Sequence, residues 1–185
     1  MRNFVSFLAV MLIALSGPSI AFADQNDPKL DGLFEQLAKA ESFQDAAEIE
    51  RQIWSIWVRR DNSRIDSHMA LGIKAMRTGA LKLSLREFTR VVTLDPEFAE
   101  GWNKRATVHY MMGNLELSVA DIQKTLALEP RHYGALAGMG LIFDATNNPS
   151  GALKAWEQVL KFTPYNMQIQ KRVEDLKAEL DGKPI

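Results

Sequence analysis

Small and bulky side chains recur along this chain with a period of 34 residues. Prolines at 96, 130 and 164 mark the ends of three units, 65–98, 99–132 and 133–166. The eighth and twentieth positions of each unit hold small residues: Gly72, Ala106 and Gly140, then Ser84, Ser118 and Ala152. The twenty-fourth and thirtieth hold bulky apolar ones: Phe88, Ile122 and Trp156, then Leu94, Leu128 and Phe162. This pattern predicts two antiparallel helices per unit, crossing closely at the small residues while the bulky ones fill the remaining space.

Residues that favour turns lie in the middle of each unit. Thr78-Gly79, Gly113-Asn114 and Asn147-Asn148-Pro149 supply residues that end one helix and start the next. The proline at the end of each unit prevents the second helix from continuing. Each unit therefore reads as helix, turn, helix.

The period, the small and bulky positions and the terminal proline together resemble the tetratricopeptide repeat. Trp102 also stands at the fourth position, where that family often carries tryptophan. The resemblance covers 65–166 and implies an all-α fold, a right-handed α-solenoid of helix-turn-helix repeats.

One period earlier, 31–64 fits as a degenerate first repeat. Glu50 replaces the small twentieth residue, and Asn62 stands in place of the proline. Terminal repeats are commonly atypical because they have a neighbour on only one side. We expect its two tryptophans, Trp54 and Trp57, to pack on the second unit.

Beyond the last proline, one apolar stripe predicts a C-terminal capping helix over 167–181. Ile169, Val173, Leu176 and Leu180 recur at helical spacing among charged residues, as the end of an open stack requires. We expect 24–30 to be a flexible N-terminus and 182–185 to fray.

The first 23 residues read as a secretory signal peptide. Arg2 precedes an apolar run, 4–15, and Ala21-Phe22-Ala23 gives the small-x-small pattern of a cleavage site after Ala23. An uncleaved anchor is the alternative, although the run is shorter than the ~20 residues of a spanning helix. No later stretch approaches that length, so we expect a mature chain that does not span the membrane, exported to the periplasm.

Charge and composition exclude several classes of function. The formal net charge is −1 and no basic run occurs, so nucleic acid is not an expected partner. The chain has no cysteine, which excludes thiol chemistry, disulfides and a lipid-modified cysteine. The three histidines lack zinc-site spacing, and no phosphate loop or serine elbow occurs. We predict no catalytic residue, metal, cofactor or small-molecule substrate.

The sequence also predicts whether individual titratable residues are buried or exposed. His109 falls mid-helix, where the family buries a tyrosine, and is expected in the core. The acidic residues Asp95, Glu97 and Glu100 lie at a junction between units and are expected to be solvated surface.

The resemblance implies that the first helices line a concave face through positions two, five, nine, twelve and thirteen. The residues we expect to bind a partner there form an apolar, methionine-containing strip with a polar edge: Met69, Ile73, Met76, Arg77, Asn103, Thr107, Tyr110, Met111, Leu141 and Asp144. The expected occupant is an amphipathic helix or extended apolar segment of a protein or peptide. The alternative is that several of these residues only pack between helices.

One binding mode of the family is not expected. Some members clamp a C-terminal carboxylate with lysine and asparagine at positions five and nine, but here Met69 and Ile73 stand there. Of the later basic positions only Lys104 is filled, and Gly138 replaces an arginine.

The repeats and the signal peptide together resemble small periplasmic tetratricopeptide proteins of Gram-negative bacteria. That resemblance implies a non-catalytic adaptor or scaffold for protein–protein interaction that supports cell-envelope integrity or assembly. The alternatives are a holdase-like chaperone for exported proteins, an assembly factor in cytochrome c maturation, and an enzyme whose catalytic groups the sequence does not display.

Overall fold

The computed structural model describes residues 24–182, so the predicted signal peptide and its cleavage site after Ala23 lie outside the described residues, as do 183–185. Within that range the chain is all-helical, with no β-strand: α1 Lys29–Ala38, α2 Phe43–Trp57, α3 Ser63–Arg77, α4 Leu81–Leu94, α5 Ala99–Met111, α6 Leu115–Leu128, α7 Tyr133–Ala145, α8 Pro149–Leu160 and α9 Met167–Leu180. None of these helices is long and apolar enough to cross a membrane.

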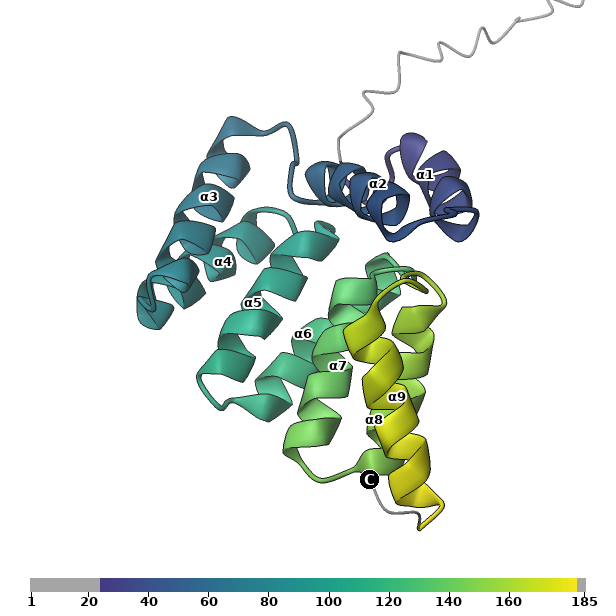
Figure 1. The fold of residues 1–185 in the computed structure, drawn as a ribbon. Helices are drawn as coiled ribbons and strands as arrows, with labels where there is room; N and C mark the ends of the chain where they lie inside the picture. The colour runs from purple at the N-terminus through teal and green to yellow at the C-terminus, as the bar shows by residue number, and fades with distance from the viewer. Residues whose placement is uncertain (1–23, 183–185) are drawn as a thin grey trace, which may run out of the picture.

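Helices α3 to α8 form three helix-turn-helix pairs that stack in chain order. Each of these helices packs on its neighbours in sequence, α5 also contacts α3 and α7, and α9 packs on α8 (Figure 1). The predicted all-α solenoid is therefore confirmed.

The small and bulky positions meet as the period predicts. A Cβ built on Gly72 would lie 2.6 Å from the ring of Phe88, and one on Gly140 would lie 2.6 Å from that of Trp156. The twentieth residue adds a bond that the pattern did not predict: the hydroxyls of Ser84 and Ser118 each donate, at 2.9 Å, to the backbone carbonyl of the eighth residue. The helices of the second and third units are thus held by both shape and a buried hydrogen bond, whereas Ala152 at the twentieth position of the fourth unit has no hydroxyl to donate.

The mid-unit turns depend on one left-handed residue each. Gly79 and Gly113 adopt φ of 74° and 77°, and Asn147 adopts φ of 54° at the same place in the last unit. Glycine takes this conformation without steric cost, and asparagine tolerates it better than most residues. Asn148 then caps α8 by accepting from the backbone N–H of Gly151.

The first helical pair packs differently from the other three. Trp57 and Ile53 of α2 join a buried cluster with Tyr133, Trp156 and Val159, and none of the buried members of that cluster comes from 65–98. The expectation that Trp54 and Trp57 pack on the second unit is therefore wrong. Their large rings instead find aromatic partners at the junction of the third and fourth units, His132 and Tyr133.

Residues 24–62, which we call the N-terminal strap, contact all three proline-bearing loops between units. Arg60 forms an ion pair with Asp95 in the first loop, and Asp31 lies 2.7 Å from Arg131 in the second. At the third, the rings of Phe34 and Phe162 lie 5.8 Å apart. Figure 1 shows α1 and α2 at one edge of the stack, away from α3. The strap therefore ties successive units together.

The segment expected to be a flexible N-terminus is fixed at its start. Asp24 and Gln25 are both buried. Gln25 donates to the backbone carbonyl of Glu97 and accepts from the backbone N–H of Ala99, while Asp24 pairs with Arg60. The expected flexibility is thus wrong for these two residues, because Gln25 satisfies backbone atoms near the start of α5 and Asp24 is held by Arg60.

Candidate partner-binding groove

A cavity of about 120 Å³ lies between α5 and α7, the first helices of two successive units. Ser118 and Ile122 of α6 also line it. No charged side chain belongs to the lining, which consists of Asn103, Ala106, Thr107, Tyr110, Ser118, Ile122, Gly134, Ala137, Gly138 and Leu141. For comparison, an apolar protein cavity of ~150 Å³ holds a benzene molecule. This cavity therefore matches one aliphatic or aromatic side chain.

Four of the predicted partner-binding residues lie together in this lining, namely Asn103, Thr107, Tyr110 and Leu141. Leu141 is 43% exposed, and Met111, at the C-terminal end of α5, is 48% exposed. Two large apolar side chains thus reach solvent on the first helices of these units. The groove defined by these residues is smaller than the predicted one.

The predicted residues of α3 lie elsewhere. Met69 is only 2% exposed and packs with Phe88 and Phe98 in the core of the second unit, so its assignment to a binding surface is wrong. Its unbranched side chain fills an interior gap, as methionine commonly does. Ile73 and Met76 are half-buried against the same core, and Arg77 is exposed at the end of α3.

Asp144 is already engaged by its own chain. Its carboxylate accepts from the indole N–H of Trp156 at 2.9 Å and from Arg172 at 2.6 Å. These bonds join α7 to α8 and α9. The Asp144 side chain therefore stabilises the packing of these helices and does not form the edge of a groove.

Small residues of α7 complete the lining. Gly134 and Ala137 stand at positions two and five of the fourth unit, on the face that the resemblance implied, whereas the prediction missed Gly138 together with Ala106, Ser118 and Ile122. Gly134, Ala137 and Gly138 line the cavity together with Leu141, at the three- and four-residue spacing of a single helix face. A Cβ on Gly138 would lie 3.1 Å from Ile122. The spacing of these small residues was the signal in the sequence that could have located the cavity.

The N-terminal strap closes one end of this groove. A Cβ on Gly134 would lie 2.7 Å from the ring of Trp54, and the Lys104 ammonium sits 5.1 Å from the centroid of that ring. Position two of the fourth unit, where the family's geometry places a ligand contact, thus faces the chain's own tryptophan. A partner has to bind beyond it, toward Tyr110 and Leu141.

Glu100 lies buried at this closed end. It is 1% exposed, which corrects the expectation of solvated surface. Its carboxylate lies 2.8 Å from the Lys104 ammonium and 3.0 Å from Nε2 of His132, and it accepts from the Asn103 amide at 2.7 Å. Burial by itself raises the pKa of Glu100, but Lys104 and His132 outweigh it and lower that pKa to about 2. The carboxylate is therefore ionised and paired at neutral pH.

His132 connects this network to the strap and to α7. Its Nδ1 accepts from the backbone N–H of Ala135 at 3.2 Å, which caps α7 and leaves Nε2 to donate to Glu100. Its ring is fully buried under Trp57. The predicted burial of the other internal histidine is confirmed: His109 is 7% exposed, and burial lowers its pKa.

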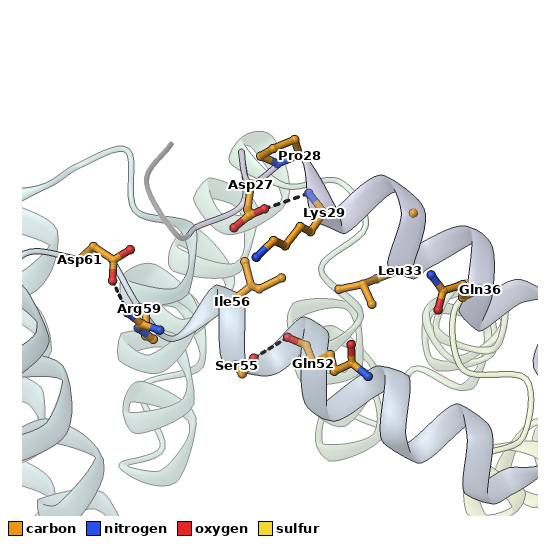
Figure 2. Close-up of a pocket in the computed structure, with 11 residues that line it drawn as sticks. Asp27, Pro28, Lys29, Leu33, Gln36, Gln52, Ser55, Ile56, Arg59 and Asp61 are labelled. Carbon is orange, nitrogen blue, oxygen red and sulfur yellow. Dashed lines mark hydrogen bonds and ion pairs between the residues drawn. The ribbon is translucent and has the colours of Figure 1, made fainter. Parts of the chain in front are cut away.

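A second, larger cavity of about 700 Å³ lies between α1 and α2. Figure 2 shows its mixed lining, with Leu33 and Ile56 among Lys29, Gln36, Gln52 and other polar groups. Arg59 pairs there with Asp61, and the Ser55 hydroxyl donates to the backbone carbonyl of Gln52. Its lining shares no residue with the predicted binding surface.

The described residues contain no group of three or more histidine, aspartate or glutamate side chains that could hold a metal ion. The buried carboxylates of the described residues pair with basic groups of the same chain, and they are Asp24, Glu87, Glu100, Asp121 and Glu129. Their geometry serves packing between helices.

Stacked 34-residue helix pairs, with a side-chain-sized cavity between successive first helices, define a helical-repeat protein of the solenoid class. The chain belongs to the tetratricopeptide-repeat family. It is 35% identical over 154 residues to a TPR repeat-containing protein of Rhizobium etli, a match that covers 83% of this chain and 76% of that protein. No family model matches the sequence.

The solved structures that share the fold include two complexes with peptides. The first TPR of Spaghetti (RPAP3), bound to the HSP90 peptide SRMEEVD, is similar with a TM-score of 0.61 at 19% identity, covering 65% of this chain and 96% of that one. The Yersinia enterocolitica type III secretion chaperone SycD, in complex with a peptide of the translocator YopD, has a TM-score of 0.60 at 9% identity, covering 64% and 96%.

Proposed function

We propose that this protein is a non-catalytic periplasmic adaptor that holds a segment of a partner protein in the groove between α5 and α7. The cavity of about 120 Å³ between these helices carries the proposal, because it accepts one apolar side chain and offers no charge to a ligand. Burial of one leucine or phenylalanine there contributes ~1.5–3 kcal/mol to binding. The exposed Leu141 and Met111 extend the apolar surface beside it.

The occupant we propose is an amphipathic helix or extended segment that inserts one large apolar side chain. The small residues Ala137 and Gly138 support this choice, because they let a partner backbone approach α7 closely. The fold relatives described above bind peptides. The acidic peptide held by the Spaghetti domain differs in chemistry from the uncharged cavity of this chain.

The decisive experiment places a photocrosslinking residue at Tyr110 in living cells, with a matched control at the exposed Lys171 of α9. One or two proteins captured at Tyr110 and not at Lys171 support an adaptor. Capture of these proteins should fall at least tenfold when Ala137→Leu fills the cavity. If Ala137→Leu leaves the amount of crosslinked protein unchanged, the assignment of the groove as the binding site is wrong.

A holdase-like chaperone is the second candidate, favoured by the exposed Met111 at the open end of the groove, because methionine adapts to varied surfaces. A broad range of exported proteins captured at Tyr110, each lost in Ala137→Leu, would favour this function over the adaptor.

The envelope role and the periplasmic location rest on the apolar N-terminal segment and its Ala21-Phe22-Ala23 pattern. N-terminal sequencing of the protein from a periplasmic extract tests them. A mature chain that begins at Asp24 supports export with cleavage. An intact Met1 in the cytoplasmic fraction removes this part of the proposal.

A further inference from the structure

A further groove, of about 470 Å³ and distinct from the cavity between α1 and α2, lies on the opposite side of α7 from the partner-binding groove. Leu136, Met139 and Phe143 of α7 line it, between Leu126 of α6 and Ala155 of α8. The first groove uses residues 134, 137, 138 and 141 of the same helix. At ~100° per residue these two sets fall on opposite faces of α7. The two grooves are therefore separate surfaces.

In the preceding unit, an ion pair occupies the equivalent positions. Arg105 and Asp121 occupy the positions of Met139 and Ala155, one period earlier, and form two hydrogen bonds of 2.7 Å. The guanidinium of Arg105 also stacks on Trp102, 4.7 Å from its ring centroid. A charged seam thus joins α5 to α6 in the third unit.

The second unit has a comparable pair. Glu87 takes the position of Asp121, and its carboxylate lies 2.8 Å from Nδ1 of His68 in α3. In both units an acidic residue of the second helix is paired with a basic residue of the first. In the fourth unit apolar side chains replace both partners, and an open apolar groove lies where the seam would run.

One charged side chain lines this groove. Lys154 is exposed on α8 and has no ion-pair partner among residues 24–182, and no acidic residue belongs to the lining. The neutral polar members of the lining are Asn148, Ser150 and Gln158. A mostly apolar surface with a single uncompensated cation is complementary to apolar side chains next to a carboxylate.

We propose that this groove is a second interaction surface, which binds a partner segment with large apolar side chains flanked by an aspartate or glutamate. The surface does not depend on the groove between α5 and α7, so it stands whether or not that groove binds a partner. If both bind, the chain joins two partners through opposite faces of one helix.

The test uses the purified chain and a displayed library of linear peptides as the probe. Enriched peptides are synthesised and titrated against the wild type, and the protein carries ¹³C-labelled methionine methyl groups. We expect enriched peptides to combine large apolar residues with an acidic one, and to shift the Met139 methyl signal but not that of Met111.

The double variant Met139→Arg with Ala155→Asp places the ion pair of the third unit into the fourth. We expect it to weaken these peptides at least tenfold. Lys154→Glu should weaken them severalfold, whereas the matched reversal Lys82→Glu on α4 should leave them unchanged. If the double variant does not fold, the peptide affinity of the Lys154→Glu variant tests the proposal by itself. The Lys154 side chain is exposed, so its replacement should leave the fold intact.

Three outcomes overturn the proposal. In the first, no peptide is enriched. In the second, enriched peptides bind the double variant as well as the wild type, or shift Met111 rather than Met139. In the third, the wild type self-associates and the double variant does not, so that the groove is occupied by a second copy of the chain.

Discussion

The ring of Trp57 stacks on that of His132, with centroids 4.3 Å apart and planes inclined by 10°. The two residues are 75 positions apart in the sequence, and their contact places the N-terminal strap on the junction of the third and fourth units. The Nε2 atom of His132 bonds to Glu100, and its Nδ1 atom accepts from Ala135. One buried cluster therefore joins the strap, the groove and the start of α7.

We predict that Trp57→Ala loosens the strap. Truncation of a buried tryptophan costs ~3–5 kcal/mol, since the cavity left behind cannot fully collapse. The free energy of unfolding, measured by denaturant titration, should fall by about that amount, and limited proteolysis should cleave within 24–62 first. Trp102→Ala is the control, because that indole is only partly buried and its truncation should cost ~1 kcal/mol. Equal losses in the two variants would contradict a strap held by Trp57.

Stability in acid should depend on Glu100. Its pKa is about 2 in the folded chain and 4.5 in the ordinary case, so its contribution is present above pH ~4.5 and is lost as the pH falls through about 2. Glu100→Gln should reduce the free energy of unfolding at pH 7 by an amount on the order of 3 kcal/mol. The difference from wild type should vanish toward pH 2.

The matched variant for this experiment is Glu97→Gln, because the Glu97 side chain is two-thirds exposed and pairs only loosely with Lys124. Its stability curve should follow that of the wild type across the same pH range. A Glu100→Gln deficit that stays constant from pH 7 to pH 2 would show that the loss comes from packing rather than from the charge.

Close helix crossing predicts opposite effects for two helical glycines. Gly140→Ala should destabilise the protein by ~1–3 kcal/mol, because the new Cβ would lie 2.6 Å from the Trp156 ring. Gly32→Ala in α1 meets no atom within 4 Å and should stabilise by ~0.5–1 kcal/mol through helix propensity. Thermal unfolding of the two single variants measures both signs. A neutral Gly140→Ala would mean that the crossing relaxes freely.

The left-handed turn residues predict a graded series at one position. Gly113→Ala should cost ~1–2 kcal/mol, because φ is 77° there. Gly113→Asn should cost less, since Asn147 holds the same conformation at the corresponding place in the fourth unit. Melting temperatures of the two variants rank them, and the reverse order would indicate that side-chain contacts, not backbone strain, dominate this turn.

The repeat pattern predicted the stacked helix pairs because their determinants are local. Glycine or serine at a crossing, an aromatic residue beside it and a proline after the second helix act within one unit of 34 residues. The same positions placed Thr107, Tyr110 and Leu141 in one groove, because a helix face follows from spacing alone.

Burial of single residues was less predictable. Met69 and Glu100 occupy positions that the resemblance places on the concave face, yet both are buried here. Met69 is covered by the core of the second unit, and Glu100 by Lys104, His132 and the strap. Such burial depends on which segment of the folded chain covers a position, and a local sequence pattern does not identify that segment.

The sequence by itself thus determined the solenoid, its turns and the helices that line its faces, because the 34-residue period encodes contacts within a unit and between adjacent units. Only the tertiary structure decided where the first helical pair packs, what closes the groove and which charges are buried. These features rest on contacts between residues far apart in the chain, such as Trp57 with His132 and Gln25 with Ala99. The free energy of such contacts depends on the folded surfaces that meet, and hydrophobic periodicity does not specify the partner.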